Sequence, residues 1–422
     1  MNLILGNIRS FAGEHEITVK PLTILVGENS SGKSTFLAAL STVSNSHSFP
    51  SVAGLNTPPY DLGGFETIAT YKGGKAGRSR AFSLGYSSGK ARVVVSYRSF
   101  RSEIRLHKID FHTAGPRGHL TVMQNQISGR IRNLGSDKIR IPVRAKLTDS
   151  GAFPGSISMV IMRSLMERRA RMSDISLRSI FEIESAVTGN NLPAVSIAPV
   201  RSKPRRTYDQ TRDQYDPSGD HVPYVLARLV FSRSPQSSKL LNALTEFGRE
   251  SGLFTRIEPK RLGRSPGSPF KINVTVAGRP ASLPDVGYGV SQALPILVES
   301  ILQSKPARML LQQPEVHLHP KAQAALGSFF ARIVAETQTE FVIESHSDHL
   351  LDRIRQEVAR GVIPHDAVKI LFFHKPRSET QVFELSLDTS GNVLKAPPEY
   401  RAFFLQEELK LLNRTELAEI CA

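Results

Sequence analysis

The sequence predicts an α/β fold, and three short apolar runs carry that prediction. The first, LTILV at residues 22–26, has the length and composition of a buried strand, and a glycine-rich turn and a helix-forming run follow it directly. The runs at residues 309–311 and 341–343 are also short and apolar, and each ends in polar side chains. We therefore expect buried strands with helices between them, and functional residues at the strand ends.

The composition is that of an ordinary globular chain. Its 422 residues are 40% hydrophobic and 22% charged, enough for about two to three domains. The single cysteine, Cys421, excludes a disulfide framework or a cysteine-based zinc site within one chain. No secretory leader is recognised, and no apolar run approaches the ~20 residues that span a bilayer. We expect a cytoplasmic protein with no membrane partner.

The net charge of +16 favours polyanionic partners such as nucleic acid or an acidic protein, although solubility alone would also account for it. One cluster of cations, Arg201, Lys203, Arg205 and Arg206, follows a predicted buried strand. Three readings of this loop stay open: a solvated loop, a nucleic-acid contact, or a contact with a nucleotide phosphate across a dimer.

Residues 27–34, GENSSGKS, fit the phosphate-loop pattern G-x-x-x-x-G-K-[ST] between a strand and a helix. Glycines let the backbone wrap around phosphate oxygens, so that N–H groups and the helix N-terminus point at the anion. Lys33 is predicted to bridge the β- and γ-phosphates of ATP, and the Ser34 hydroxyl to ligate Mg²⁺. The predicted nucleotide-binding residues are Gly27, Asn29, Ser30, Ser31, Gly32, Lys33, Ser34 and Thr35.

Three later segments follow the phosphate loop in a fixed order. The segment GYGVSQ, residues 287–292, leads into a helix whose start offers N–H groups and a hydroxyl to an anion. The segment QQPEVHLHP follows the apolar run at 309–311, and ESHS follows the run at 341–343. Each segment alone is a weak signal, whereas the ordered set is specific.

Together with NIRSFAGEHEITVKPLTILVGENSSGKST near the N-terminus, this set resembles the SMC/RecF/Rad50 branch of ABC-type ATPases. More closely, it is similar to bacterial AAA-family ATPases related to the ATPase half of OLD-family nucleases and to Septu-type phage-defence ATPase subunits. The resemblance covers about residues 1–80 and 190–375. It implies a P-loop NTPase with an ABC-ATPase-like two-lobe head, formed by a mixed central sheet and an antiparallel β lobe, with a short, partly helical insertion.

The resemblance also implies roles for individual residues. Ser291 and Gln292 stand in the ABC signature, where Ser291 would approach the γ-phosphate of ATP on a partner subunit. Gln312 and Gln313 occupy the Walker B position, and His346 matches the switch histidine. Such proteins dimerise head-to-tail around two nucleotides, so a second copy of the chain is an expected partner.

The Walker B position departs from the family pattern. Gln312 and Gln313 stand where acids are usual, and a neutral amide cannot neutralise metal charge or take a proton. Gln312 remains a candidate for the Mg²⁺ shell, and Glu315, beyond Pro314, is the nearest candidate carboxylate. We expect ATP to bind well and to be hydrolysed slowly. In the alternative, Glu315 and His346 together suffice for ordinary turnover.

The expected domains are an N-terminal ATPase lobe at 1–110, a basic and partly helical insertion at 111–190, a C-terminal ATPase lobe at 191–375, and a closing hairpin with a tail at 376–422. Amphipathic helices are expected between residues 156 and 185. The pair His317 and His319 could ligate a metal, but structural positions in the loop are the favoured interpretation.

The favoured function is an ATP-dependent assembly ATPase of anti-phage defence that scaffolds or regulates a separate effector such as a nuclease. An integral nuclease is not expected, because no D-x-D pair follows His346. The alternative is a RecF/Rad50-like repair ATPase that clamps DNA, which the basic charge supports. A transporter-type ATPase is a third hypothesis, but GYGVSQ and PEVHLHP match transporter signatures poorly.

Overall fold

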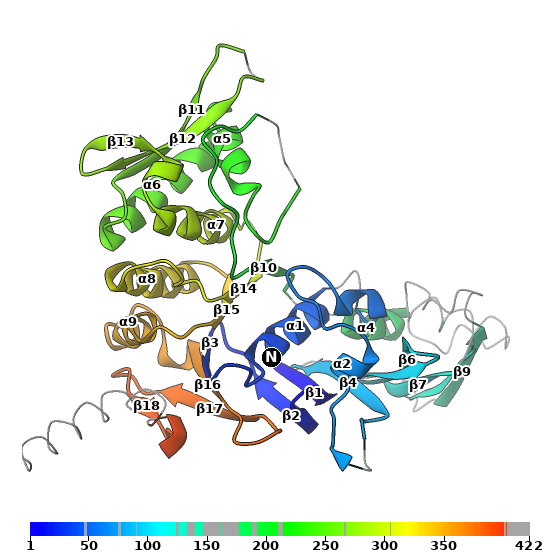
Figure 1. Cartoon of the computed structure of the whole chain (residues 1–422). Helices are drawn as coiled ribbons and strands as arrows, with labels where there is room; N and C mark the ends of the chain where they lie inside the picture. Colours follow the sequence, from blue (N-terminus) through cyan, green and yellow to red (C-terminus); the bar gives the residue numbers. More distant parts are fainter. Residues whose placement is uncertain are drawn as a thin grey trace, which may run out of the picture. The chain divides into compact units, whose positions relative to one another are not determined.

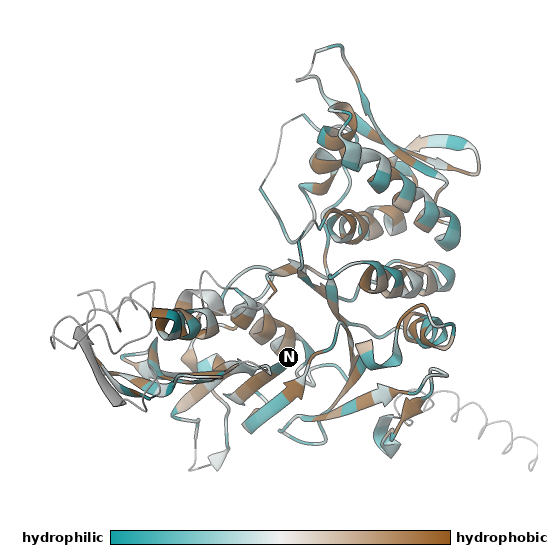
Figure 2. Cartoon of the chain, turned by 180° about the vertical axis from the view of Figure 1, so that it is seen from behind, coloured by the Kyte–Doolittle hydropathy of each residue, from teal (hydrophilic) through white to brown (hydrophobic). Residues whose placement is uncertain are grey.

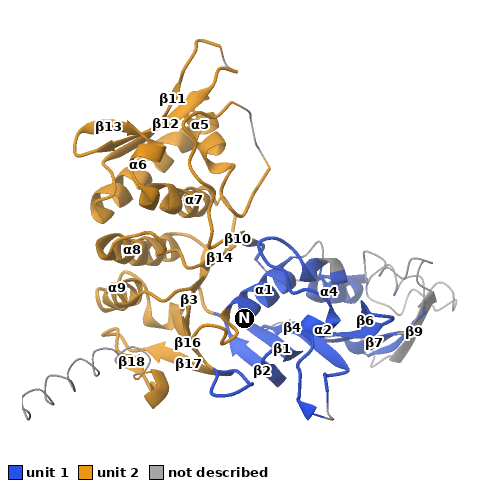
Figure 3. Ribbon diagram, in the orientation of Figure 1, with its two compact units in different colours: residues 1–19, 34–194, 375–381 blue, residues 20–33, 195–374, 382–422 orange. Residues whose placement is uncertain are grey.

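The computed structural model describes residues 1–45, 49–74, 77–89, 91–123, 126–132, 140–146, 161, 177–187, 192–209, 214–265, 267–303, 305–400 and 402. The chain forms two compact units (Figure 3). Unit 1 comprises residues 1–19, 34–194 and 375–381, and unit 2 comprises residues 20–33, 195–374 and 382–422. These bounds differ from the four expected ranges, because the strand before the phosphate loop belongs to unit 2 although its sequence neighbours belong to unit 1.

Unit 1 is built on an eight-stranded antiparallel sheet in the order β2-β1-β4-β5-β6-β7-β8-β9 (Figure 1). The strands are β1 (Asn2–Ile8), β2 (Phe11–Thr18), β4 (Ala81–Ser87), β5 (Ala91–Phe100), β6 (Glu103–Thr113), β7 (Arg117–Met123), β8 (Gln126–Arg132) and β9 (Arg140–Lys146). Hydrophobic and hydrophilic residues alternate along several of these strands, as Figure 2 shows. The alternation gives the sheet one buried face and one open face.

Among the described residues, the helices of unit 1 include α1 (Lys33–Ser44), η1 (Val52–Leu55), α2 (Phe65–Ile68) and α4 (Leu177–Val187). Helix α4 packs on β5 and β6, and the hydroxyl of the buried Tyr86 donates to the carbonyl of Ala186. The insertion expected at 111–190 to be partly helical is largely β-structure where it is described, because β7, β8 and β9 lie within it. Helix α4 is the described part of the helices expected at 156–185, and 156–176 apart from Ile161 lie outside the described residues.

Unit 2 contains a seven-stranded sheet in the order β10-β14-β15-β3-β16-β17-β18. Its strands are β3 (Leu22–Gly27), β10 (Ala194–Ile197), β14 (Arg308–Gln312), β15 (Glu340–Glu344), β16 (Val368–His374), β17 (Gln381–Leu387) and β18 (Val393–Leu394). The central strands β14, β15, β3 and β16 run parallel, whereas β17 and β18 are antiparallel. All six residues of β3 are buried, which explains its unbroken apolar sequence.

The main helices of unit 2 are α5 (Val222–Phe231), α6 (Pro235–Ser251), α7 (Tyr288–Leu302), α8 (Pro320–Glu336) and α9 (Asp348–Ala359), with the short turns η4 (Leu283–Asp285) and η5 (His365–Ala367). A three-stranded antiparallel sheet, β11 (Arg256–Arg261), β12 (Phe270–Val276) and β13 (Arg279–Ser282), completes the unit. Ser234, His319 and Ser347 accept a backbone N–H at the starts of α6, α8 and α9, so side chains fix where these helices begin.

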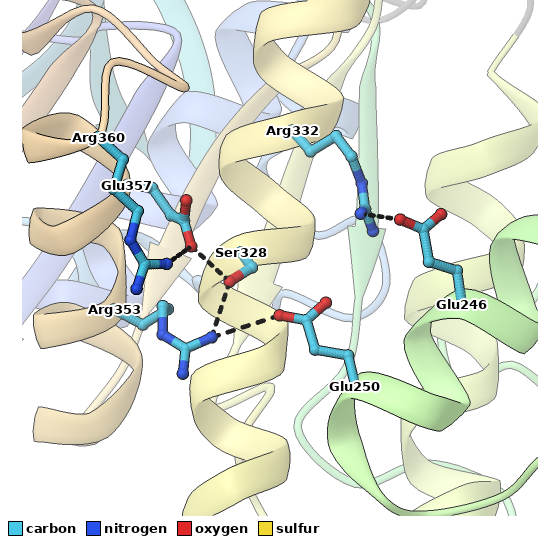
Figure 4. Close-up of polar contacts among 7 residues, drawn as sticks. All are labelled: Glu246, Glu250, Ser328, Arg332, Arg353, Glu357 and Arg360. Carbon is cyan, nitrogen blue, oxygen red and sulfur yellow. Dashed lines mark hydrogen bonds and ion pairs between the residues drawn. The ribbon is translucent and has the colours of Figure 1, made fainter.

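Polar contacts join α6, α8 and α9 across their packed faces (Figure 4). The Ser328 hydroxyl donates to Glu357 at 2.7 Å and accepts from Arg353 at 3.0 Å. Arg353 also reaches Glu250 at 3.3 Å. Because Glu357 is buried and its oxygen is hydrogen-bonded, this network holds α9 in register with the helix beside it.

The predicted α/β P-loop fold class is confirmed, with a mixed sheet and an antiparallel sheet where each was expected. Each of the three apolar runs forms a parallel strand of the same sheet. Among the described residues, no helix combines the length and hydropathy needed to cross a membrane.

Candidate nucleotide site

The candidate site lies at one edge of the parallel sheet of unit 2, where three strands end. Leu25 pairs with Glu344, which in turn pairs with Gln312. Because these strands are parallel, their carboxyl ends lie at the same edge. The phosphate loop, the QQPE segment and the ESHS segment therefore begin beside one another, as expected for a ligand site in an open α/β sheet.

The phosphate loop has the backbone that its glycines predict. Gly27 has a φ of 137° and Gly32 a φ of 108°, and Ser30, between them, has a φ of 61°. A side chain at Gly27 would bring its Cβ to 2.1 Å from the carbonyl oxygen of Phe373 on β16. Asn29 and Ser30 are exposed on the loop and Ser31 is buried.

Helix α1 starts at Lys33, directly after the loop. The ammonium group of Lys33 is folded back onto the loop and donates to the carbonyls of Gly27 at 2.8 Å and Glu28 at 2.7 Å. Burial lowers the pKa of Lys33, and the carboxylates of Glu344 and Glu28 oppose that shift. Ser34 is exposed on the first turn, and Thr35 is buried and accepts a hydrogen bond from Arg9 at 3.2 Å within unit 1.

The QQPE segment begins at the end of β14, and the contacts there set the geometry of Gln312 and Gln313. Gln312 ends β14, and its amide Nε2 donates to Oε2 of Glu344 at 3.3 Å. Gln313 has a φ of 45°, which is uncommon for a residue other than glycine, and its N–H donates to the carbonyl of Glu344 at 2.8 Å. Both glutamines are thus anchored to the end of β15.

Glu344 is the carboxylate at the centre of this edge. It is 6% exposed, and its charge opposes the lowering of the pKa of both Lys33 and His346. The sequence reasoning gave Glu344 no role. The signal that would have found it is its place directly after a buried strand that lies between β14 and β3, but this strand order is not visible in the sequence.

Glu315 and His346 meet at the next turn. The backbone N–H of His346 donates to Oε1 of Glu315 at 2.7 Å, while Oε2 of Glu315 is buried without a hydrogen-bond partner among the described residues. Burial raises the pKa of Glu315, opposed by the hydrogen bonds from the His346 N–H and the Ser345 side chain and by the charge of Arg201. Burial and then the charge of Lys33 lower the pKa of His346.

Arg201 is a second residue that the sequence reasoning misplaced. It is 4% exposed, and its Nη2 donates to the carbonyls of Gln312 at 3.3 Å and Gln313 at 3.1 Å. Burial lowers its pKa to about 10, opposed by the charge of Glu315, so Arg201 remains a cation at neutral pH. It clamps the turn after β14 from the side of β10.

The other cations of this loop are held by acids or exposed. Arg205 forms two bonds of 3.0 Å with Asp220, and Arg206 binds both oxygens of Asp285 at 2.9 and 3.2 Å. Lys203 is exposed. The reading of these residues as one solvated charge run is therefore wrong for Arg201, which lies inside, and incomplete for the two arginines paired within unit 2.

The signature segment starts α7 earlier than expected. The helix begins at Tyr288, so Ser291 and Gln292 lie in its first turns and are buried. The Ser291 hydroxyl donates to the carbonyl of Tyr288 at 2.8 Å, a bond within its own helix. The Tyr288 ring lies 5.9 Å from the His317 ring, which places the start of α7 against the loop that follows Glu315.

The two histidines of that loop have structural roles in part. Nδ1 of His319 accepts the N–H of Ala322 at 3.4 Å and so caps α8. His317 has a φ of 67° and lies at the bend of the loop. The favoured structural interpretation agrees with the capping role of His319.

The fold and the phosphate loop define a P-loop ATPase. Residues 2–152 match a family model described as "AAA domain", and residues 263–352 match one described as "AAA domain, putative AbiEii toxin, Type IV TA system". Together with the phosphate loop, these matches identify the chain as an ATPase. No curated protein is similar enough to the chain to count as a match.

Several solved structures are distantly similar. A head domain of Smc bound to the C-terminal winged-helix domain of ScpA is 13% identical, with a TM-score of 0.43, 92% of this chain and 98% of that chain covered. A head domain of Smc with an extended coiled coil, bound to the C-terminal domain of ScpA derived from Pyrococcus furiosus, is 11% identical, with a TM-score of 0.43 and 98% of each chain covered. The SMC head domain from Thermotoga maritima is 11% identical, with a TM-score of 0.38, 90% of this chain and 97% of that chain covered.

Proposed function

We propose that the chain is an ABC-type ATPase that binds ATP tightly, hydrolyses it slowly, and uses the bound nucleotide to assemble with a second copy and a separate effector. The observation that carries this proposal is the edge where Lys33, Gln312 and Glu344 meet. The ammonium of Lys33 and the phosphate loop suit a nucleoside triphosphate, whereas Gln312 and Gln313 place amides where ATPases of this type usually carry acids.

The backbone of the phosphate loop and the start of α1 fit the phosphates of ATP. The positive φ values of Gly27, Ser30 and Gly32 curve the backbone, and the N-terminus of α1 follows at Lys33. When ATP binds, the ammonium of Lys33 would exchange its bonds to two neutral carbonyls for bonds to phosphate oxygens. Hydrogen bonds between charged groups are stronger than those to neutral carbonyls, so this exchange would be favourable. Within unit 2, Gln312 and Glu344 would hold Mg²⁺, which would neutralise phosphate charge when bound.

Slow hydrolysis follows from the chemistry of the side chains. Gln313 can orient a water molecule through its amide but cannot accept a proton from it. Glu344 is the ionisable group beside Gln312, and we assign it the role of the missing carboxylate. Glu315 is held by the His346 N–H and is buried, and burial raises its pKa, so it is less suited to that role.

A composite dimer is the second part of the proposal. Ser291 in the signature segment would complete the ATP site of a partner copy, as the resemblance implies. The exposed Tyr288, 51% accessible at the start of α7, is consistent with a segment that meets another chain. Its buried neighbours Ser291 and Gln292 would need the first turn of α7 to adjust.

The defence role rests on resemblance. The description of the family matched by residues 263–352 names a putative AbiEii toxin of a type IV TA system. This supports a role in defence, and the likeness to the ATPase half of OLD-family nucleases and to Septu-type subunits supports an effector that is a separate nuclease. The alternative, a DNA-clamping repair ATPase, is favoured by the net charge of +16.

The first test measures ATP binding, ATP turnover and particle size with Mg²⁺, with and without DNA. We expect binding and enlargement, with turnover well below the ordinary enzyme range of about 1 to 10³ s⁻¹. Brisk turnover that DNA accelerates would overturn the proposal in favour of the repair-type alternative.

Variants of two carboxylates assign the chemistry. Glu344→Gln should keep ATP binding and abolish the residual turnover, while Glu336→Gln, a change at the exposed end of α8, should affect turnover little. Equal turnover in both variants would remove Glu344 from the reaction.

Purification of the tagged chain from its own cells with ATP should recover a nuclease, and recovery of the chain alone would contradict the proposal of a separate effector.

A further inference from the structure

We propose that the open face of the antiparallel sheet in unit 1 binds the phosphate backbone of duplex nucleic acid. This face carries a cavity of about 460 Å³ above β5, β6, β7 and β8. Its walls are formed mainly by the arginines Arg92, Arg117, Arg130 and Arg132 and the histidines His112 and His119, with Asp110 as the acid that lines it. The inference is independent of how fast the ATP site turns over.

The strand register explains why these arginines and histidines gather. Arg92 lies opposite His112, His112 opposite Arg117, and Arg117 opposite Arg132, so the four form one row across the sheet. Asp110, His119 and Arg130 form the next row on the same face. Residues two apart along a strand share a face, which places the two rows side by side.

The opposite face of the same strands is a hydrophobic core. Val93, Phe111, Leu120 and Ile131 are buried there, whereas His112, Arg117, His119, Arg130 and Arg132 are exposed. The alternation is regular from Ile109 to Thr113 of β6 and through the described side chains of β7 and β8. The cationic face is therefore a built surface of the sheet and does not depend on loop conformation.

Three of these arginines have no acidic partner in the part of the chain that the structure describes. Arg117, Arg130 and Arg132 make no side-chain hydrogen bond or ion pair with the residues that the structure describes. Asp110 is held by Lys108 at 2.9 Å, and Arg92 at the side of the cavity is paired with Glu14 at 2.7 Å and with Glu16. The acids near the cavity are thus already engaged by other cations.

Like charges directly opposite one another on a sheet are destabilising. Arg117 faces Arg132, and an acid or a neutral residue in either place would relieve the repulsion. By contrast, Arg256 on β11 is paired with Glu258 at 2.7 Å, and Arg105, at the far end of β6, is paired with Glu103 at 3.2 Å. An anionic ligand would offset the repulsion at the cavity.

The chemistry selects a phosphodiester chain. Guanidinium groups match phosphate oxygens in a planar, bidentate way. The row from Arg92 to Arg132 crosses three strand spacings of ~4.8 Å, or about 14 Å, a length of duplex axis over which each strand carries about four phosphates at ~3.4 Å of rise. The surface is longer than a single phosphate group needs.

The face favours a duplex over a single strand. Single-strand sites stack bases on exposed aromatic rings, and the aromatic residue at this cavity, Phe111, is only 3% exposed. A duplex presents its phosphates outward and keeps its bases paired, so a cationic surface alone can hold it. We therefore expect binding without sequence preference.

The test uses the full chain without nucleotide and a short fluorescent DNA duplex of mixed sequence, with anisotropy measured over a range of salt. The triple variant Arg117→Ser, Arg130→Ser, Arg132→Ser should bind at least about tenfold more weakly. The slope of log affinity against log salt should fall by about 2.7, the value for three lost phosphate contacts.

A matched control removes the same charge elsewhere. Lys260, Arg264 and Arg279 are exposed residues around the three-stranded sheet of unit 2, and their triple serine variant should leave the slope nearly unchanged. An equal loss in both variants would show that net charge alone attracts DNA, and would overturn the proposal. An unchanged affinity in the first variant would overturn it as well.

Further arms separate other ligands and guard against misfolding. The melting temperature of the first triple variant should not fall, because repulsion is removed; if it falls, the single change Arg132→Ser should still reduce the salt slope by about one. Competition by single-stranded DNA of the same length should be weaker than by duplex. Displacement by tripolyphosphate or polyglutamate at equal charge concentration would overturn the duplex assignment.

Discussion

The phosphate loop and the turn after β14 lie at the same edge of one sheet, yet they differ in how their structure is stabilised. The phosphate loop depends on glycines and on a lysine that binds its own backbone. The turn after β14 depends on side chains from elsewhere, since Arg201 holds its carbonyls and Glu344 holds its amides. The comparison teaches that a local motif can be recognised from its letters, whereas a site assembled from distant strands cannot.

The largest effect is expected at the phosphate loop. Gly27→Ala combines a φ of 137° with a Cβ 2.1 Å from the Phe373 carbonyl oxygen, so we expect a loss of about 3 kcal/mol or more in unfolding free energy, with ATP binding lost. Urea unfolding and a nucleotide-binding assay check this. Gly278→Ala, where φ is 79° but the space is open, should cost about 1 kcal/mol and spare ATP binding. Equal costs at both positions would contradict the steric argument.

The next effect concerns the clamp on the turn. Arg201→Ala removes a buried cation that binds two carbonyls and leaves the buried Glu315 carboxylate without its nearby charge, so we expect a loss of about 3 kcal/mol. Arg206→Ala, which breaks an exposed pair with Asp285, should cost well under about 1 kcal/mol. Similar melting temperatures for the two variants would show that Arg201 does not stabilise the turn.

A smaller effect is expected when the turn is made to resemble the usual acidic pattern. Gln312→Glu places a second carboxylate beside Glu344 in place of a hydrogen bond of 3.3 Å, so stability without metal should fall by about 1 kcal/mol. Mg²⁺ with ATP should restore it and raise turnover, because the metal neutralises the pair. Thermal melts with Mg²⁺ or with a chelator measure the difference, and a melt that does not respond to Mg²⁺ would argue against a metal site at Gln312.

The smallest effect concerns pH. Burial and Lys33 lower the pKa of His346 below its unfolded value, so the unfolded chain binds more protons and stability rises with pH through this window. The wild type should therefore lose stability as the pH falls below about 6.5, the pKa of an unperturbed histidine, and His346→Gln should lose less. The difference is small, since His346 is an exposed residue. Identical pH dependence of the melts would remove His346 from this balance.

The features that the sequence predicted correctly are those formed by residues that are contiguous in the chain. The phosphate loop, the strand before it and the strand ends at Gln312 and Glu344 could be located because apolar runs and glycine spacing are local properties. The role of Glu344 could not be predicted, since it depends on β15 lying between β14 and β3. Arg201 was read with its charged neighbours, because burial of a single residue within a charge run leaves no mark on the pattern.

The strands of unit 1 at residues 117–146 were missed for a different reason. On β7 and β8, glycines stand at positions where apolar residues would be expected, so the alternation of apolar and polar residues is interrupted. Because the open face also carries arginines, the segment looks like a basic, turn-rich loop in the sequence. Gly118 and Gly129 sit on the buried face, where a Cβ would lie 2.5 Å and 2.2 Å from backbone oxygens of neighbouring strands. Glycine at those places permits close strand packing but weakens the sequence signal for a strand.

The place of β3 in its sheet has a consequence for how the protein is made. This strand contains residues 22–27 but lies between β15, residues 340–344, and β16, residues 368–374. On the ribosome, the apolar segment LTILV has no neighbour of this sheet to pair with until more than three hundred further residues have been added. Closure of so long a loop is slow, and an unpaired apolar strand is prone to aggregate in the meantime. We therefore expect a nascent chain that stops short of β15 to carry the phosphate-loop sequence without a formed site.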